Sequence, residues 1–202
     1  MLEPYFSLFT PSIRYDNIPK IYRSLKPFVN KYKFDWWICY DSWQPIYEPV
    51  SENWIHQFTY KEMGGIAGNH QRNYLLDQIQ DGYCFSLDDD TIIHPDFFPV
   101  LSRCIIETQK RGFLFHDQLA DDAILYARAG HIREGSIGNQ NFAIHKSLIQ
   151  MNRMNIHYCA DGEFIEKMYK RYPDEFIIID QVLAYHNRLL VRSDWENFLV
   201  KE

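Results

Sequence analysis

The sequence has no hydrophobic run long enough to cross a membrane and no concentration of basic residues. None of its apolar stretches reaches the ~18 residues that a membrane-spanning helix needs. Its 21 Lys and Arg residues are outnumbered by 27 Asp and Glu residues, which gives a net charge of −6. A surface that follows a nucleic-acid backbone needs clustered basic side chains. We therefore expect neither a membrane span nor a nucleic-acid partner.

Closely spaced cysteines and a secretion signal are also absent. The only cysteines are Cys39, Cys84, Cys104 and Cys159, and no two of them lie close together. This spacing is not typical of a zinc site or a disulfide framework, so it predicts reduced and mostly buried thiols. The N-terminus carries Glu3 and lacks the basic start of a secretory signal, which favours a cytoplasmic location.

The composition is that of a soluble globular chain, with 46% hydrophobic and 24% charged residues. A length of 202 residues predicts one domain. The aromatic share is high at 16%, which indicates either an aromatic-rich core or flat surfaces that stack on rings.

Apolar runs and helical periodicities alternate over the first 110 residues. This alternation predicts an α/β fold, with an open sheet that carries helices on both faces. Ligands of such sheets bind at the carboxyl ends of the strands, where Asp41 and the run from Asp88 to Asp90 are expected. The expected strands are 5–10, 34–40, 54–60 and 83–87, and the expected helices are 16–26, one between Gly64 and Gly82, and one from Pro95 to about Lys110.

The second half of the chain is predicted to be richer in strands. One helix is expected from about Asp161 to Arg171, where apolar residues recur at helical spacing. The expected strands are 112–118, 124–129, 138–144 and 175–186.

Three adjacent carboxylates, Asp88, Asp89 and Asp90, follow the apolar strand Tyr83 to Leu87. They repel one another unless something compensates their charge, and Mg²⁺ or Mn²⁺ does so because these cations prefer oxygen ligands. The alternative is a solvated acidic turn whose side chains accept hydrogen bonds from nearby backbone N–H groups.

A glycine-rich segment with Gly64, Gly65 and Gly68 precedes Arg72. Glycines permit a ligand to approach the backbone closely, and a helix N-terminus attracts anions. The positively charged guanidinium group of arginine adds two parallel hydrogen-bond donors, so the segment suits a diphosphate. The segment is not a Walker A loop, because no Gly-Lys-Ser/Thr follows. A helix start after a flexible loop explains it equally well.

In their order, these residues resemble the nucleotide-sugar-binding half of GT-A-fold glycosyltransferases, especially the family 2-like inverting enzymes. The resemblance covers residues 5–98, and the chain is also similar in size and layout to short glycosyltransferases of large algal viruses and bacteria. The residues that carry it are Thr10-Pro11 after the first strand, Asp41 after the second, Arg72-Asn73 in the helix, the DxD-like Asp88-Asp89-Asp90, and the tail DTIIHPDF.

The resemblance implies a single GT-A domain over residues 1–202, with a nucleotide-sugar-binding half at 1–98 and an acceptor-binding half at 99–202. It implies a hexosyltransferase that uses a UDP-sugar donor, Mn²⁺ or Mg²⁺, and the hydroxyl of a glycan or another acceptor. A viral member would act in the host cytoplasm. In the implied roles, Thr10, Pro11 and Asp41 bind the base, Arg72 lies beside the base or the phosphates, Asp88 contacts the ribose or the metal, Asp90 ligates the metal, and Asp89 does either.

The resemblance also implies an acidic general base and a late metal-binding histidine in the second half. Asp161 is the candidate general base, with Glu163 in reserve, since a carboxylate can take the proton of an attacking hydroxyl. The alternative role of Asp161 is a helix N-cap. His186 is expected to be a third metal contact or a structural histidine, and Arg188 is expected to hold the diphosphate.

Two other functions remain open on the sequence alone. A HAD-like phosphohydrolase also carries Asp-x-Asp after an apolar strand, but usually on its first strand, whereas three strands precede Asp88 here. A non-catalytic Ca²⁺-dependent carbohydrate-binding module could use the acidic loop, but such modules are usually all-β. A retaining transferase would make Asp161 only an acceptor contact.

Overall fold

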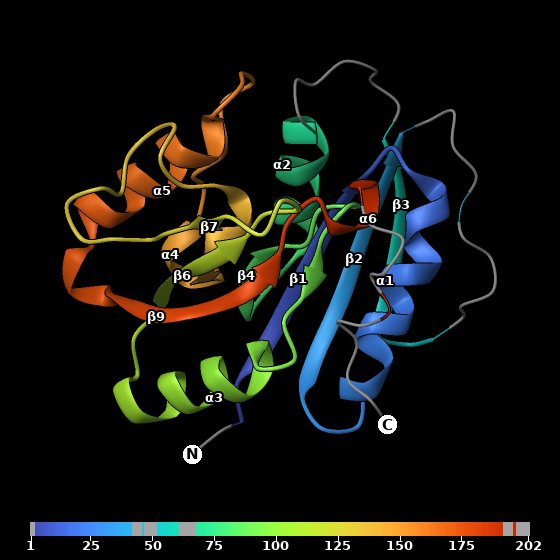
Figure 1. Ribbon diagram of the computed structural model, residues 1–202, viewed down its shortest axis with the longest axis horizontal. Helices are drawn as coiled ribbons and strands as arrows, with labels where there is room; N and C mark the ends of the chain where they lie inside the picture. The colour runs from blue at the N-terminus through green and yellow to red at the C-terminus, as the bar shows by residue number, and fades with distance from the viewer. Residues whose placement is uncertain (1–2, 42–45, 47–51, 61–67, 192–195, 197–202) are drawn as a thin grey trace.

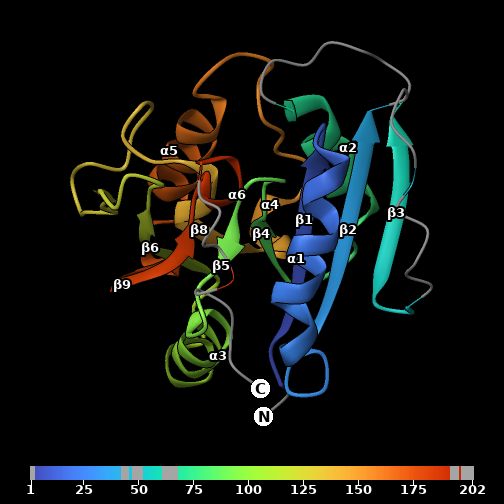
Figure 2. The same ribbon diagram turned by 45° about the vertical axis from the view of Figure 1, so that its right-hand side comes forward.

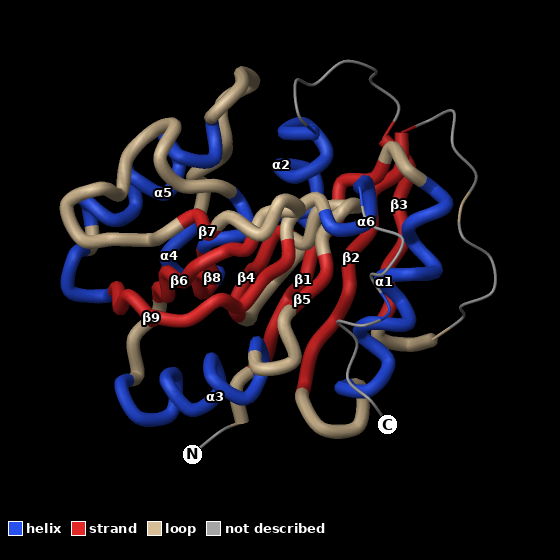
Figure 3. The backbone as a smooth tube through the Cα atoms, viewed as in Figure 1, coloured by secondary structure: helices blue, strands red, loops and turns tan. Residues whose placement is uncertain are grey.

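The computed structural model describes residues 3–41, 46, 52–60, 68–191 and 196 of the chain. One sheet crosses this part of the molecule, as Figures 1 and 3 show, and its strand order is β3-β2-β1-β4-β8-β6-β9-β5 with β7 paired to β6. The strands are β1 (Tyr5–Ser12), β2 (Lys33–Asp41), β3 (Ile55–Tyr60), β4 (Tyr83–Ser86), β5 (Ile92–Ile93), β6 (Gly112–Gln118), β7 (Ile124–Leu125), β8 (Phe142–His145) and β9 (Phe176–Tyr185).

The sheet divides into a parallel part and a mixed part. β1 pairs in parallel with β2 and β4, and β2 pairs in parallel with β3, so the carboxyl ends of these four strands lie at one edge. β8 runs antiparallel to both β4 and β6, while β9 is parallel to β6 and carries β5 antiparallel at the far edge. The chain therefore brings the ends of β1, β2 and β4 to the same rim.

Helices cover both faces of the sheet, as Figure 2 shows for α1 in front of β1 and β2. α1 (Ile18–Leu25) and α3 (Phe97–Thr108) bury their apolar residues in one core cluster, and α2 (Asn69–Gln78), α4 (Lys146–Ile149) and α5 (Ala160–Arg171) bury theirs in another. The remaining helical segments are α6 (Arg188–Val191) and the 3₁₀ turns η1 (Tyr15–Asn17), η2 (Lys26–Phe28), η4 (Asn139–Asn141) and η5 (Pro173–Glu175).

Side-chain alternation along β1 explains why the strand holds two cores. Phe6 and Leu8 lie in the α1/α3 cluster, and Phe9 points to the opposite face and lies in the α2/α5 cluster. A strand covered on both faces needs apolar residues at consecutive positions, which is the pattern of YFSLF.

The predicted alternation of strands and helices in the first half is confirmed, and so is the helix of the second half, α5. Two predicted strands were wrong in extent. The strand expected at 124–129 is only the two residues of β7, and the strand expected at 138–144 begins at Phe142. The turn η4 precedes it, and within that turn Asn141 Nδ2 donates hydrogen bonds to the carbonyl oxygens of Phe115 and Leu125. The short elements β5, α4 and α6 were not predicted.

All four cysteines are free, and Cys39 and Cys84 are buried while Cys104 and Cys159 are partly exposed. Burial raises the pKa of the Cys39 and Cys84 thiols to about 12, so both stay protonated at neutral pH. Across the described residues, the longest and most apolar helices fall short of what a membrane crossing requires.

Candidate functional site

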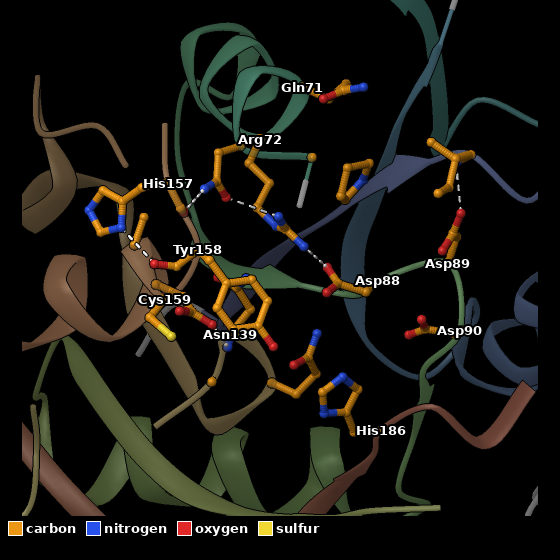
Figure 4. Close-up of a pocket in the computed structure, with 18 of the residues that line it drawn as sticks. Gln71, Arg72, Asp88, Asp89, Asp90, Asn139, His157, Tyr158, Cys159 and His186 are labelled. Carbon is orange, nitrogen blue, oxygen red and sulfur yellow. Dashed lines mark hydrogen bonds and ion pairs between the residues drawn. The ribbon is translucent and has the colours of Figure 1, made fainter. Parts of the chain in front are cut away.

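A cavity of about 450 Å³ opens at the carboxyl ends of β1, β2 and β4. Its wall combines the parallel half of the sheet with α2, the segment before β8, and the first turn of α5 (Figure 4). The predicted site residues that line it are Pro11, Asp41, Arg72, Asp88, Asp89, Asp90, Asp161 and His186. The topological prediction that Asp41 and the acidic run share one rim is therefore confirmed.

The acidic run forms a tight turn against the end of β1. The Leu87 N–H donates to the carbonyl oxygen of Phe9 over 3.0 Å, and the Thr91 N–H donates to that of Asp88 over 2.9 Å. These bonds hold the three carboxylates within one loop, where each has its own set of partners.

Asp88 is paired with Arg72, as the dashed line in Figure 4 shows. Arg72 Nη2 donates to Asp88 Oδ1 over 2.7 Å, and its Nε and Nη1 donate to Ser86 Oγ and Asn69 Oδ1, both over 3.1 Å. The Arg72 side chain is only 4% exposed. Burial acts to raise the pKa of the Asp88 carboxyl, but the charge and hydrogen bond of Arg72 outweigh it and leave that pKa lowered. Asp88 is therefore a fixed anion at neutral pH.

Asp89 is held by the backbone that follows β1. Its Oδ2 accepts the N–H groups of Ile13 and Arg14 over 2.7 and 2.8 Å, and its Oδ1 accepts Arg14 Nη1 over 2.5 Å. Burial raises the pKa of Asp89, and the Arg14 charge opposes that shift. Asp89 thus joins the acidic loop to the end of β1 rather than extending into the cavity alone.

Asp90 is the least compensated of the three acids. Its Oδ2 accepts Arg14 Nη1 over 3.2 Å, and its Oδ1 accepts Thr91 Oγ1 over 3.3 Å, which are both long contacts. Burial, together with the charges of Asp88 and Asp89, raises the pKa of Asp90 to about 6. The loop consequently carries negative charge that favours a bound cation.

His186 follows β9 and lies beside Asp88 and Asp90 in the view of Figure 4. Its Nδ1 is 3.3 Å from Oδ2 of Asp117, a carboxylate at the end of β6 that is fully buried. Burial acts to lower the pKa of His186, but Asp117, Asp88 and Asp90 outweigh it and raise that pKa. An Nδ1–H directed at Asp117 would leave Nε2 as the metal-binding atom, which is the arrangement typical of metal-ligating histidines.

The donor set of Asp88, Asp90 and His186 fits a hard divalent cation in its chemistry. Asp117 supports the fit, because neither oxygen of its buried carboxylate has a hydrogen-bond partner among the described residues, and His186 Nδ1 approaches one of them to 3.3 Å. Within the described ranges, no three His, Cys, Asp or Glu side chains are already arranged as a complete metal-binding group.

Asp41 and Pro11 form the end of the cavity next to α2. Asp41 Oδ1 accepts a hydrogen bond from Gln71 Nε2, and the carboxylate is partly exposed. α2 begins after Gly68, where the φ of +74° favours glycine and where a Cβ would lie only 3.0 Å from Pro11 Cβ. Gly64 and Gly65, predicted to belong to the same anion-binding segment, lie outside the described residues.

Asp161 lines the same cavity as the acidic loop. It lies in the first turn of α5, where its Oδ1 accepts the Gly162 N–H over 2.8 Å and its Oδ2 accepts the Asn139 N–H over 3.1 Å. The N-cap of α5 is Cys159, so the alternative N-cap role for Asp161 is wrong. Cys159 has a φ of +65°, a conformation that non-glycine residues adopt rarely and that is found at functional sites.

Three predicted site residues do not line the cavity. Thr10 is fully buried, donating to Leu87 O over 2.5 Å and accepting from Trp36 Nε1 over 2.8 Å. Glu163 accepts hydrogen bonds from His157 Nε2 and Asn155 Nδ2, which lower its pKa. Arg188 is fully buried and its Nη atoms lie 3.3 Å from Asp122 Oδ1. In this structure all three side chains hold segments together at the margin of the site.

Several cavity residues were not predicted, among them Arg14, Asn139 and Tyr158, and neither was Asp117 behind His186. Asp117 is the last residue but one of the apolar strand β6, close to the strand end as Asp41 is in β2, so a similar pattern could have found it. Arg14 carried no comparable signal, because its partners lie 75 and 76 residues away in the sequence.

Solved structures with the same fold include S. aureus TarS, for which residues 1–349 give a TM-score of 0.66 at 13% identity over 91% of this chain and 60% of that one. TarS 1–349 has also been solved with UDP-GlcNAc, at a TM-score of 0.61 and 12% identity over 90% and 58%, and with UDP. A mycobacterial protein matches at a TM-score of 0.62 and 12% identity over 91% and 67%. This chain thus spans less than two thirds of the TarS structures.

Neither a protein-family model nor a curated protein sequence matches the chain. The structural likeness confirms the predicted fold, a GT-A-type α/β domain with a Rossmann-like first half and a β-rich second half. The first half alternates strands and helices, which is unlike the all-β architecture usual for the alternative, a Ca²⁺-dependent carbohydrate-binding module.

Proposed function

We propose that this protein is a metal-dependent glycosyltransferase that moves a sugar from a UDP-sugar to a hydroxyl group of a glycan or another acceptor. The observation that carries the proposal is the composition of the cavity at the sheet edge. Asp41, Arg72, the acidic loop and Asp161 all line it, so one cavity combines groups suited to a nucleotide diphosphate with a carboxylate suited to a base. A protein of the same fold has been solved with UDP-GlcNAc and with UDP.

In this proposal the nucleotide lies along the parallel half of the sheet. Asp41 accepts the ring N–H of uracil, Pro11 bounds the base, and Asp88 contacts the ribose while Arg72 fixes its carboxylate. The partial positive charge at the start of α2 and the Arg72 guanidinium favour the diphosphate side of the cavity. A divalent cation held by Asp90, with Asp88 and His186, would neutralise the charge that develops on the departing diphosphate.

Asp161 is the proposed general base. The acceptor hydroxyl attacks the anomeric carbon, its oxygen forms the new bond, and its proton passes to the Asp161 carboxylate. The bond between the anomeric carbon and the diphosphate oxygen breaks, and its electron pair leaves with UDP. A single displacement of this kind inverts the anomeric centre. The Asn139 and Gly162 N–H groups orient the base, since each donates to one of its oxygens.

Calorimetric titration of UDP, GDP and ADP in the presence of Mn²⁺ tests the donor assignment. We expect UDP to bind most tightly and Asp41→Ala to remove most of this preference, because the aspartate accepts a hydrogen bond that only some bases donate. Asp96→Ala is the matched control, since Asp96 is exposed and lies away from the cavity at the start of α3. Equal affinity for the three nucleotides, or none for any of them, would rule out the UDP-donor proposal.

A further inference from the structure

Arg14 bridges two of the three acids of the proposed metal loop. Its Nη1 lies 2.5 Å from Asp89 Oδ1 and 3.2 Å from Asp90 Oδ2, and its side chain lines the cavity. The Arg14 side chain is 37% exposed, whereas those of Asp89 and Asp90 are 4% and 10% exposed. An accessible cation thus reaches into a buried anionic loop from the solvent side.

The charges of the loop are divided unequally between two arginines. Arg72 is buried and donates hydrogen bonds to Asp88, Ser86 and Asn69, so its position is fixed. Asp89 keeps the N–H groups of Ile13 and Arg14 even if the Arg14 guanidinium departs. Asp90 Oδ2 lies 3.2 Å from Arg14 Nη1, and the charges of His186 and Arg14 oppose the rise of the Asp90 pKa, so a departing Arg14 would leave the Asp90 charge less compensated.

We propose that Arg14 takes the place of the divalent cation at Asp90 in the nucleotide-free protein and turns to the diphosphate when the cation binds. The proposal rests on the proposed function. A guanidinium and a divalent cation repel each other, so they compete for the Asp90 carboxylate. The two backbone hydrogen bonds to Asp89 fix the Arg14 backbone, which lets the side chain turn about an anchored Cα. Its planar fork matches phosphate oxygens.

If this exchange occurs, removal of the Arg14 charge should change the affinities for Mn²⁺ and for UDP in opposite directions. Mn²⁺ alone should bind more tightly, because its competitor is gone, while UDP should bind more weakly, because a phosphate contact is lost. A purely structural Arg14, which only ties the end of β1 to the acidic loop, would weaken both ligands together when it is replaced.

The test uses Arg14→Gln, which keeps most of the length of the side chain, and Arg103→Gln as the control on an exposed position of α3. Mn²⁺ binding without nucleotide is measured from the electron paramagnetic resonance signal of free Mn²⁺, and UDP binding by calorimetry in saturating Mn²⁺. We expect Arg14→Gln to bind Mn²⁺ roughly threefold to tenfold more tightly. We expect its affinity for UDP to fall roughly tenfold to hundredfold. Arg103→Gln should change neither.

Arg14→Lys keeps the positive charge but lacks the planar guanidinium group. It should bind Mn²⁺ with an affinity close to that of the wild type and bind UDP more weakly than the wild type. It also serves as the second variant if Arg14→Gln does not fold. A weaker or unchanged Mn²⁺ affinity in Arg14→Gln, in a protein whose wild type binds UDP with Mn²⁺, would overturn the exchange and leave the proposed function intact. A wild type that binds neither Mn²⁺ nor UDP would overturn both.

Discussion

Among the polar interactions of the site, the ion pair between Arg72 and Asp88 should cost the most stability when only one of its two partners is replaced. The Arg72 side chain is 4% exposed and that of Asp88 17%, so water compensates little for either charge when its partner is removed. Arg72→Met retains the aliphatic stem but removes the hydrogen bonds that the guanidinium donates to Ser86, Asn69 and Asp88. Leaving a buried charge unpaired costs about 3–5 kcal/mol. For a domain of this size, that corresponds to a fall in melting temperature of roughly 6–20 °C.

A double-mutant cycle separates this electrostatic cost from lost packing. Asp88→Asn removes the charge that Arg72→Met leaves unpaired, so the double variant should be less destabilised than the sum of the two single variants, by about 2 kcal/mol. Urea unfolding followed by tryptophan fluorescence measures all four proteins, and Arg103→Met on α3 is the control for loss of an exposed arginine. Additivity within about 0.5 kcal/mol, or a loss of less than about 1 kcal/mol in Arg72→Met, would refute the reasoning.

Three further predictions concern the base, the α5 turn and acid stability. Asp161→Asn should lower kcat about 10²–10⁴-fold while leaving the affinity for UDP unchanged. Glu163→Gln, at a residue that does not line the cavity, should leave kcat unchanged. Similar losses of kcat in both variants would contradict the assignment of Asp161 as the base. Gly162→Ala should destabilise the fold by about 1–3 kcal/mol despite the helix preference for alanine, because its Cβ would lie 2.8 Å from Glu134 Cα; a raised melting temperature would disprove this. Hydrogen bonds, the strongest from Lys26, lower the pKa of Glu52 in the folded protein to about 2. Ionised Glu52 therefore stabilises the fold fully at a pH above the pKa of glutamate in the unfolded chain, and this contribution is lost as the pH falls toward 2. Glu52→Gln should therefore lower the melting temperature at pH 7, and its difference from wild type should shrink as the pH falls below the ordinary glutamate pKa; a constant difference would be evidence against the shift.

The fold of the first half could be predicted because β1, β2 and β4 are covered on both faces. Coverage on two faces demands continuous apolar runs, which are visible in the sequence, and the turn residues between them mark the helices. The location of Asp41 beside the acidic loop followed from the rule that parallel strands end at one edge. The residue type at each strand end was enough for that inference, because the path of the backbone alone places the strand ends at one edge of the sheet.

Side-chain direction and long-range pairing could not be predicted in the same way. Thr10 and Arg188 lie close to the cavity in the chain, yet each is turned into the protein by a partner far away, Trp36 and Asp122 respectively. The contact of Arg14 with the acidic loop and the contact of Asp117 with His186 arise from the packing of segments distant in sequence. No local sequence pattern predicts such pairs, because the residues that flank each partner in the sequence do not indicate its distant contact.

The measurement that tests the central claim most directly is the titration of UDP into the wild-type protein and into Asp90→Ala, each with Mn²⁺ and with EDTA. We predict that the wild type binds UDP tightly only with Mn²⁺, and that Asp90→Ala loses this metal-dependent gain while Asp96→Ala retains it. UDP binding of equal strength in all conditions would contradict the assignment of Asp90 to a metal. The absence of UDP binding to the wild type under both conditions would contradict the account of the cavity as a nucleotide-sugar site.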